Sequence, residues 1–298
     1  MVFWRDYLDH LVQKDSLPSP TGLSYEIVTT HEDCEEVRAH WRQHFGSPPH
    51  TPILDLPEEI ITNDLVLIVR DQNGVIAGSI WYHPMGTYNG KPVHLVDGFC
   101  IHPDWRKKGV GDYLLTELHR LTVDTPYTLF LKEGAPLSHA PFYTGHYVYR
   151  ALQEGLKPFK SFIHAVTPRQ ARRLLAVYQE MDPSLILLHQ SSTKNQRWWR
   201  YHRGIHHVLV CIQDTYQWKE GKKMGWITAW LESPGLTDSI REEAAWLLSD
   251  RAYPEFSYVW MDARWCSSAE WIPDGTFHWY AYRWDLCFRV KRSYAWVL

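Results

Sequence analysis

The chain has 298 residues, a formal net charge of −3 at pH 7, and a composition that is 45% hydrophobic and 22% charged. These values fit a soluble globular protein with a substantial core, organised as one large domain or as two domains of ordinary size. The small net charge gives no general attraction to nucleic acid or to anionic membranes, although local patches are possible, and no nucleic-acid partner is expected.

The five cysteines are odd in number, widely spaced and free of any Cys-x-x-Cys pair. This pattern favours reduced thiols over a disulfide framework or a zinc knuckle, and we expect no metal. The start of the chain lacks the apolar region of a signal peptide, and no apolar run is long enough to span a bilayer. We therefore expect a cytoplasmic protein without a transmembrane segment.

The first half of the chain predicts the order strand, helix, three strands, helix, strand. Hydrophobic periodicity and turn signals place these elements at residues 24–30, 31–45, 65–70, 75–82, 93–101, 106–122 and 127–131, after a short amphipathic helix over residues 2–13. This order is typical of an α+β fold with a mixed sheet and not of a doubly wound parallel sheet.

The second half predicts a weaker echo of the same order. A helix is expected at residues 168–181, strands at 207–213 and 226–231, a helix at 237–251, and strands at 256–261 and 277–284. The sequence therefore predicts two tandem mixed sheets flanked by helices, in domains at residues 1–157 and 158–298.

A basic glycine-containing segment, Arg106-Lys-Lys-Gly-Val-Gly111, lies between a predicted strand and a predicted helix. Gly109 and Gly111 would let backbone N–H groups approach an anion without a β-carbon in the way. The helix N-terminus would add its partial positive charge, and Arg106, Lys107 and Lys108 would add cations. This favours a pyrophosphate-binding loop, although the loop alone also fits a solvated helix N-terminus.

The spacing Arg-x-x-Gly-x-Gly after Ile101-His-Pro resembles the coenzyme A signature of the GCN5-related N-acetyltransferase superfamily, and the strand order is similar too. Within the superfamily the chain is most similar to the N-myristoyltransferases, which are two such folds in tandem. The resemblance covers most of the chain beyond the first twenty residues. It is carried, in the same order, by the segments at residues 98–108, 141–152, 167–168, 225–230, 274–284 and 294–298.

The resemblance implies transfer of a fatty acyl group, with myristoyl favoured, from acyl-coenzyme A (acyl-CoA) to the N-terminal glycine amine of proteins. The implied partners are acyl-CoA and the N-terminal peptides of protein substrates. The N–H groups of Gly98 and Phe99 would form the oxyanion hole, and Cys100 and Ile101 would hydrogen-bond the pantetheine. The implied cofactor-binding set is Phe99, Cys100, Ile101, Arg106, Lys107, Lys108, Gly109, Val110 and Gly111.

Three further residues have implied catalytic roles. The terminal carboxylate of Leu298 would be the general base, since a carboxylate in an apolar site has a raised pKa. Glu133, at the end of a strand beside the cofactor site, is the competing base. Tyr143 lies where many acetyltransferases place a tyrosine that protonates the leaving thiolate, and a core or interface tyrosine is the alternative.

The chain departs from N-myristoyltransferases at several positions. Gly109 and Gly111 replace an Arg and an Ala, Asp97 replaces an Asn, and residues 131–134 lose a threonine that lies near the reacting amine. Two alternatives follow. One is an acetyltransferase that uses acetyl-CoA on another amine, and the other is a catalytically silent acyl-CoA-binding protein.

Overall fold

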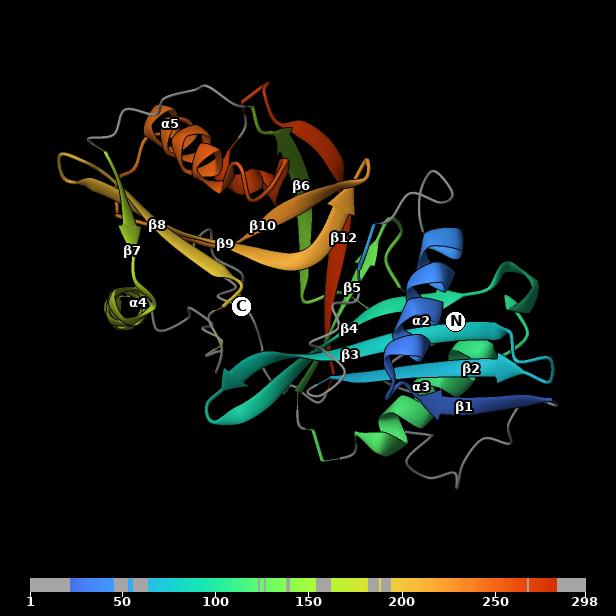
Figure 1. Cartoon of the computed structure of the whole chain (residues 1–298). Coiled ribbons are helices and arrows are strands. Elements are labelled where there is room, and N and C mark those ends of the chain that lie inside the picture. The colour runs from blue at the N-terminus through green and yellow to red at the C-terminus, as the bar shows by residue number, and fades with distance from the viewer. Residues whose placement is uncertain are drawn as a thin grey trace. The chain divides into compact units, whose positions relative to one another are not determined.

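The structure is a computed structural model of the whole chain (Figure 1). It describes residues 22–45, 53–55, 64–122, 124–125, 127–137, 140–153, 162–181, 188, 194–266 and 268–282. The chain divides into two compact units. Unit 1 comprises Met1–Met85, Lys91–Phe142 and His278–Leu286, and unit 2 comprises Gly86–Gly90, Tyr143–Phe277 and Cys287–Leu298. The helix predicted over residues 2–13 lies outside the described residues.

Unit 1 contains a mixed sheet with strand order β1-β2-β3-β4-β5-β12, in which β1 and β3 are antiparallel to β2, and β5 is parallel to β4. Its elements are β1 (Leu23–Ile27), α2 (His31–His44), β2 (Leu65–Asp71), β3 (Ile76–Tyr88), β4 (Lys91–Ile101), η2 (Pro103–Trp105), α3 (Val110–Leu121), β5 (Tyr127–Glu133) and the end of β12 (Ile272–Tyr282). The α+β class and the mixed sheet predicted from the sequence are confirmed.

The two long helices of unit 1 lie on opposite faces of this sheet (Figure 1). On one face, α3 packs Val110, Leu114 and Leu118 against inward residues of β2, β3 and β4, which form one core cluster. On the other face, α2 buries Cys34, Val37, His40 and Trp41. We call these the α3 face and the α2 face.

Helix α2 begins where the sequence predicts it, because its first turn is capped from both sides. Thr30 Oγ1 accepts the N–H of Asp33 at 3.1 Å, and Asp33 Oδ2 accepts the N–H of Thr30 at 3.3 Å. This capping box satisfies two donors that a helix start otherwise leaves unpaired. The bond from Thr30 also lowers the pKa of Asp33, so its negative charge is held near the positive end of the helix.

Unit 2 contains a sheet with strand order β12-β6-β11-β10-β9-β8-β7. Strands β10 and β11 are parallel, whereas β6 with β11, β9 with β10, β8 with β9 and β7 with β8 are antiparallel. Its elements are β6 (Tyr143–Ala151), β7 (Ile163–Val166), α4 (Pro168–Met181), β8 (Gln196–Arg203), β9 (His206–Lys219), β10 (Lys222–Glu232), α5 (Asp238–Ser249), η3 (Asp250–Ala252), β11 (Tyr258–Asp262), η4 (Ala263–Trp265) and the first part of β12. Helices α5 and α4 each cover a separate core cluster.

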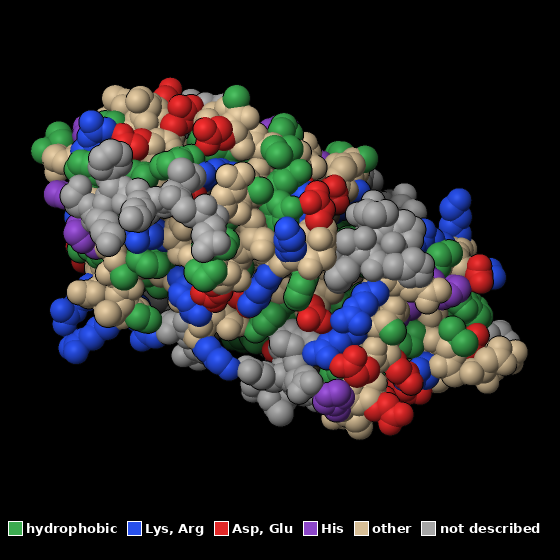
Figure 2. Space-filling view, turned by 45° about the horizontal axis from the view of Figure 1, so that its top comes forward, with side chains coloured by type: hydrophobic (Ala, Val, Ile, Leu, Met, Phe, Trp, Pro, Cys, Tyr) green, Lys and Arg blue, Asp and Glu red, His purple; other side chains and the backbone are tan. Residues whose placement is uncertain are grey.

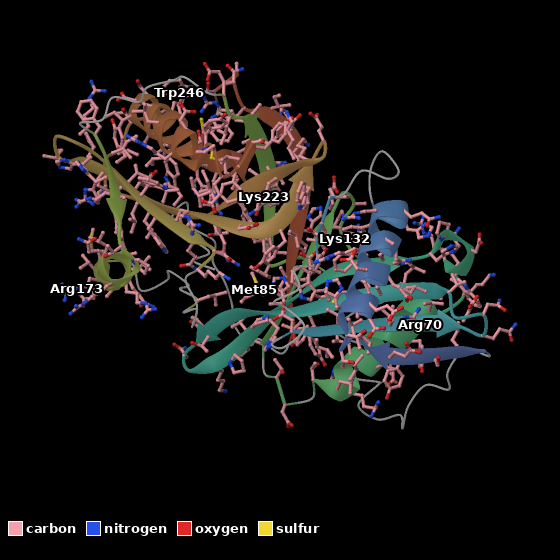
Figure 3. The ribbon with its side chains drawn as sticks, viewed as in Figure 1. Arg70, Met85, Lys132, Arg173, Lys223 and Trp246 are labelled. Carbon is pink, nitrogen blue, oxygen red and sulfur yellow. The ribbon has the colours of Figure 1, made fainter. Side chains whose placement is uncertain are left out.

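A buried ionic group ties α5 to the sheet of unit 2. Arg150 of β6 donates to Ser249 Oγ at 2.7 Å and to the carbonyl of Trp246 at 3.2 Å, and it lies 2.9 Å from Asp250 Oδ1. Its guanidinium also stacks on the Trp246 ring, which is labelled on α5 in Figure 3. These contacts satisfy a charge that would be costly to bury alone.

The two units do not follow the division predicted at residues 157/158. Strand β6 precedes that boundary but pairs with β11, so it belongs to unit 2. Strand β12 has residues in both units, so no single boundary along the chain separates the two units.

Among the described residues, no helix has the length and the apolar character needed to cross a membrane. On the face shown in Figure 2, Lys and Arg side chains are interspersed with Asp and Glu, in keeping with the small net charge.

Candidate active site

Strand β4 carries a β-bulge at Asp97 and Gly98. Val96 belongs to the core cluster on the α3 face, and Phe99, three residues later, packs against the same cluster. Strict alternation would place these two side chains on opposite faces, so one extra residue is inserted between them. Gly98 has a φ of +54°, which a glycine adopts at little cost. The bulge therefore interrupts β4 at the residues predicted to form the oxyanion hole.

The peptide after the bulge is held from β3 and α2. Trp41 Nε1 donates to Ser79 Oγ at 2.8 Å, and Ser79 Oγ donates to the carbonyl of Gly98 at 3.3 Å. The ring of Trp41 fills the space beside Gly98, where a β-carbon would lie 2.3 Å from Cζ2 of the indole. A trans peptide directs its C=O and N–H in opposite directions, so the N–H of Phe99 points away from Ser79.

The strands β4 and β5 separate beside this peptide. They are paired from Val93 with Tyr127 to Val96 with Phe130. Beyond that pair, β4 continues to Ile101 and β5 to Glu133, with no further pairing between them in the described part of the chain. The N–H of Phe99 lies on this unpaired stretch, as a donor for an oxyanion must.

Gly98, the other predicted oxyanion donor, already has an acceptor. Its N–H donates to Asp97 Oδ1 at 2.8 Å. Burial raises the pKa of Asp97, and the bond from Gly98 lowers it by less. The structure thus places beside Gly98 a carboxylate that the sequence identified only as a departure from the family, and the oxyanion roles of Gly98 and Phe99 stay predictions.

Cys100 and Ile101 continue β4 toward the basic loop. Burial raises the pKa of the Cys100 thiol to about 12, so the side chain is a neutral thiol at pH 7. The Cys100 carbonyl lies 3.4 Å from His40 Nε2, and the Ile101 carbonyl accepts a bond from Arg106 Nε at 3.1 Å. This last bond connects the predicted pantetheine strand to the predicted pyrophosphate loop.

The loop itself turns through two left-handed residues, Lys107 with a φ of +63° and Gly109 with a φ of +83°. Gly109 is the N-cap of α3 and provides no side-chain cap. The N-cap residue thus does not occupy the N–H groups of the first turn, which begins at Val110, and these groups can face an anion. Lys108 Nζ lies 5.2 Å from the centre of the Trp105 ring.

Gly111 has a packing role that the sequence did not indicate. A β-carbon at Gly111 would lie 3.1 Å from Cζ of Phe99, so this glycine allows α3 to approach β4. Gly109 has open space around it and is required by its φ alone. Packing against Phe99 thus favours glycine at position 111, and backbone conformation favours it at position 109.

Glu133 is exposed at the end of β5. The neighbouring Lys132, labelled in Figure 3, donates to the carbonyl of Glu133 at 3.1 Å and to that of Ala135. A buried histidine that the sequence did not identify, His278 of β12, lies with Nε2 2.7 Å from the carbonyl of Gly134. This contact holds the turn that follows Glu133.

Tyr143 belongs to unit 2, whereas the other described site residues belong to unit 1. Its hydroxyl donates to Asp262. Burial raises the pKa of Tyr143, and the negative charge of Asp262 raises it further. The Arg264 guanidinium lies 4.5 Å from the centre of the tyrosine ring and pairs with Asp262 at 3.2 Å. Leu298, the predicted base, lies outside the described residues. Among the residues that the structure describes, no group of His, Cys, Asp or Glu is arranged to hold a metal.

Comparison with known proteins supports the class that this geometry suggests. Residues 34–131 match the model of the acetyltransferase (GNAT) family. That span contains most of α2, the bulged β4, the basic loop and α3. The chain therefore has the GNAT acyltransferase fold, and the resemblance to this superfamily stated from the sequence is confirmed.

Several solved structures are similar over nearly the whole chain, including the following two. N-myristoyltransferase of Saccharomyces cerevisiae, solved with bound myristoyl-CoA and inhibitors, has a TM-score of 0.60 and 11% identity, and the match covers 94% of this chain and 84% of that one. A GCN5-related glucosamine N-acetyltransferase region of a fungal multi-domain β-N-acetylglucosaminidase has a TM-score of 0.52 and 15% identity, covering 90% of this chain and 38% of that one. No curated protein matches the sequence.

Proposed function

We propose that the protein transfers an acyl group from acyl-CoA to a primary amine, with myristoyl-CoA as the donor and the N-terminal glycine amine of proteins as the acceptor. The observation that carries this proposal is the bulge in β4. It directs the N–H of Phe99 away from Ser79, at a point where β4 and β5 are unpaired. The basic turn and the uncapped start of α3 follow within about ten residues.

These residues would meet two requirements of thioester aminolysis, which are a fixed acyl donor and a stabilised oxyanion. The first turn of α3 and the cations of Lys107 and Lys108 would hold the pyrophosphate, which fixes the acyl donor along Cys100 and Ile101. The N–H of Phe99 would stabilise the oxyanion that develops on the thioester carbonyl. A single well-placed donor of this kind is worth about 10²–10³ in rate.

The fatty acyl donor is supported by the similarity over 94% of this chain to a protein solved with bound myristoyl-CoA. Acetyl-CoA is the second candidate. It is favoured by the glycines at positions 109 and 111, which are typical of acetyltransferase loops, and by the similarity to a glucosamine N-acetyltransferase region.

Mass spectrometry of reaction products tests the proposal. The protein is incubated with equal concentrations of myristoyl-CoA and acetyl-CoA, together with a peptide that starts with glycine, a matched peptide that starts with alanine, and glucosamine. The proposal expects a tetradecanoyl group on the glycine peptide in excess of every other product. Acetylated glucosamine or peptide alone would support the second candidate. Acyl-CoA binding without any product would support a silent binding protein.

A further inference from the structure

The side chain of Asp97 lies on the face of β4 opposite the basic loop. The side chains before and after the bulge, Val96 and Phe99, pack on the α3 face, and the loop leads into α3 itself. Gly98 faces Trp41, which belongs to α2. By alternation from Val96, the Asp97 side chain also lies on the α2 face. The carboxylate and the predicted anion site are thus on opposite sides of the strand that carries Phe99.

The Asp97 carboxylate keeps one oxygen available. Oδ1 accepts the N–H of Gly98, and among the described residues no other group donates to this side chain. Asp97 is only partly buried, and its Oδ2 does not belong to the fully buried, unpartnered oxygens of the described residues, so a small polar group can reach it. Burial raises the pKa of Asp97, which makes its carboxylate a better proton acceptor than an exposed aspartate.

We propose that Asp97 is the general base of the acyl transfer and takes a proton from the ammonium of the acceptor. This inference rests on the proposed function. Proton transfer from nitrogen to Asp97 Oδ2 leaves a neutral amine, whose lone pair forms the C–N bond at the thioester carbonyl. The carbonyl electrons move to oxygen beside the N–H of Phe99, and their return breaks the C–S bond. The thiolate leaves with the second proton of the nitrogen, and Asp97 then releases its proton to water.

The order of charges favours this arrangement. An ionised carboxylate beside a developing oxyanion would raise the energy of the transition state. Once Asp97 has taken the proton it is neutral, so the oxyanion forms next to a protonated acid and a backbone donor. The bond from Gly98 to Oδ1 holds the carboxyl group in place during this change.

Two other carboxylates of unit 1, Glu133 and Asp64, fit the role less well. Glu133 is exposed, and Asp64 is engaged by the indole N–H of Trp81 at 2.8 Å. Of the titratable groups on the elements packed around β4, His40 of α2 is directed at the Cys100 carbonyl, and Lys132 of β5 is bound to backbone carbonyls. Neither contributes to the shift in the pKa of Asp97, which arises from burial and from Gly98.

Replacing Asp97 by asparagine tests the inference. Asp97→Asn keeps an oxygen that can accept the Gly98 N–H, so acyl-CoA binding by calorimetry should stay within threefold of the wild type. The value of kcat/KM at pH 7 should fall by about 10²–10⁴, the usual contribution of a general base. The residual rate should rise about tenfold per pH unit up to the pKa of the acceptor amine, about 8, because only the neutral amine reacts unaided. Asp97→Glu should restore part of the activity.

Two further variants are compared with Asp97→Asn. Asp238→Asn makes the same chemical change at an exposed position on α5 and should leave the pH profile unaltered. An Asp97→Asn variant with the rate and pH profile of the wild type overturns the inference, as does a Glu133→Gln variant that alone loses activity. In both cases the wild type is active, so the proposed function stands. Wild-type protein that acylates no amine instead overturns the proposed function, and the inference with it.

Discussion

The indole ring of Trp41 occupies the space beside Gly98, so that a β-carbon on this glycine would lie 2.3 Å from Cζ2 of the ring. Gly98 also has a positive φ, so two independent constraints act at one residue of the bulge. The first requires space and the second requires a backbone conformation that other residues adopt at a cost. The identity of this residue is therefore set by the α2 face as much as by the site itself.

Gly98→Ala should be destabilised by about 2–5 kcal/mol, because strain of about 1–2 kcal/mol adds to overpacking of about 1–3 kcal/mol. Gly90→Ala is the matched control, since Gly90 has a φ of +74° and nothing within 4 Å of its β-carbon position. It should show the strain alone. Urea unfolding measures both variants, and equal losses of stability would show that Trp41 yields to the added methyl group.

Ser79→Ala should lower both stability and turnover. It removes the hydrogen bond to the Gly98 carbonyl and leaves the buried Trp41 N–H unpaired, at a cost of about 1–3 kcal/mol. With the Gly98–Phe99 peptide free to rotate, kcat should fall while acyl-CoA affinity is kept. Ser249→Ala in unit 2 removes an equally buried hydroxyl and should affect stability without changing kcat per folded molecule. An unchanged kcat in Ser79→Ala would separate Ser79 from the site.

The two loop glycines should respond differently to substitution. Gly109→Ala strains the turn at φ +83° and should weaken acyl-CoA binding, whereas Gly109→Asn should recover much of it because asparagine tolerates this conformation. Gly111→Ala has no such strain, but its methyl group would press on Phe99 at 3.1 Å. It should therefore reduce kcat more than affinity. The same loss of affinity in Gly109→Asn and Gly109→Ala would argue against the conformational role.

His40 should make unit 1 less stable in mild acid. Burial is the main cause that lowers its pKa from 6.5 to about 4, and the neighbouring His44 and His102 lower it further. The unfolded chain therefore binds a proton before the folded one as pH falls through 6.5, and stability is lost from there down to about pH 4. Between pH 7 and pH 5 this amounts to about 2 kcal/mol.

The variant His40→Gln can still donate to the Cys100 carbonyl but does not titrate, so this part of the acid loss should disappear. His164→Gln, at an exposed position on β7, is the control and should behave as the wild type does. Free energies of unfolding measured by urea at pH 7 and pH 5 provide the comparison. If the free energy of unfolding of His40→Gln falls by the same amount between pH 7 and pH 5, groups other than His40 cause the loss.

Much of the fold could be predicted from the sequence because its helices have strong local signals. The Thr167-Pro168 start predicted α4 to the residue, and the acidic first turn after Thr30 predicted α2. The helix predicted from Arg106 begins instead at Val110, because Lys107 and Gly109 adopt left-handed conformations. Strands β6, β7 and β8 were not predicted, since residues such as Gly145 and Arg150 interrupt a simple alternation.

Motifs along the chain predicted candidate site residues, whereas the tertiary contacts around those residues could not be predicted. The Arg106–Gly111 spacing predicted a turn between β4 and α3, and the structure has one there, while the cofactor and oxyanion roles of these residues stay predictions. The support from Trp41 and Ser79 could not be predicted, because those residues approach Gly98 only once α2 and β3 pack on β4. The role of Leu298 stays a prediction.

Calorimetric titration of coenzyme A into the protein tests whether the turn at residues 106–109 and the start of α3 bind its pyrophosphate. The wild type should bind with one site, and a Lys107→Glu/Lys108→Glu variant should bind at least tenfold more weakly, since both cations are lost and two negative charges are added. The difference should shrink as salt is raised. Equal affinities in the two proteins, or no binding to the wild type, would contradict the assignment of this loop.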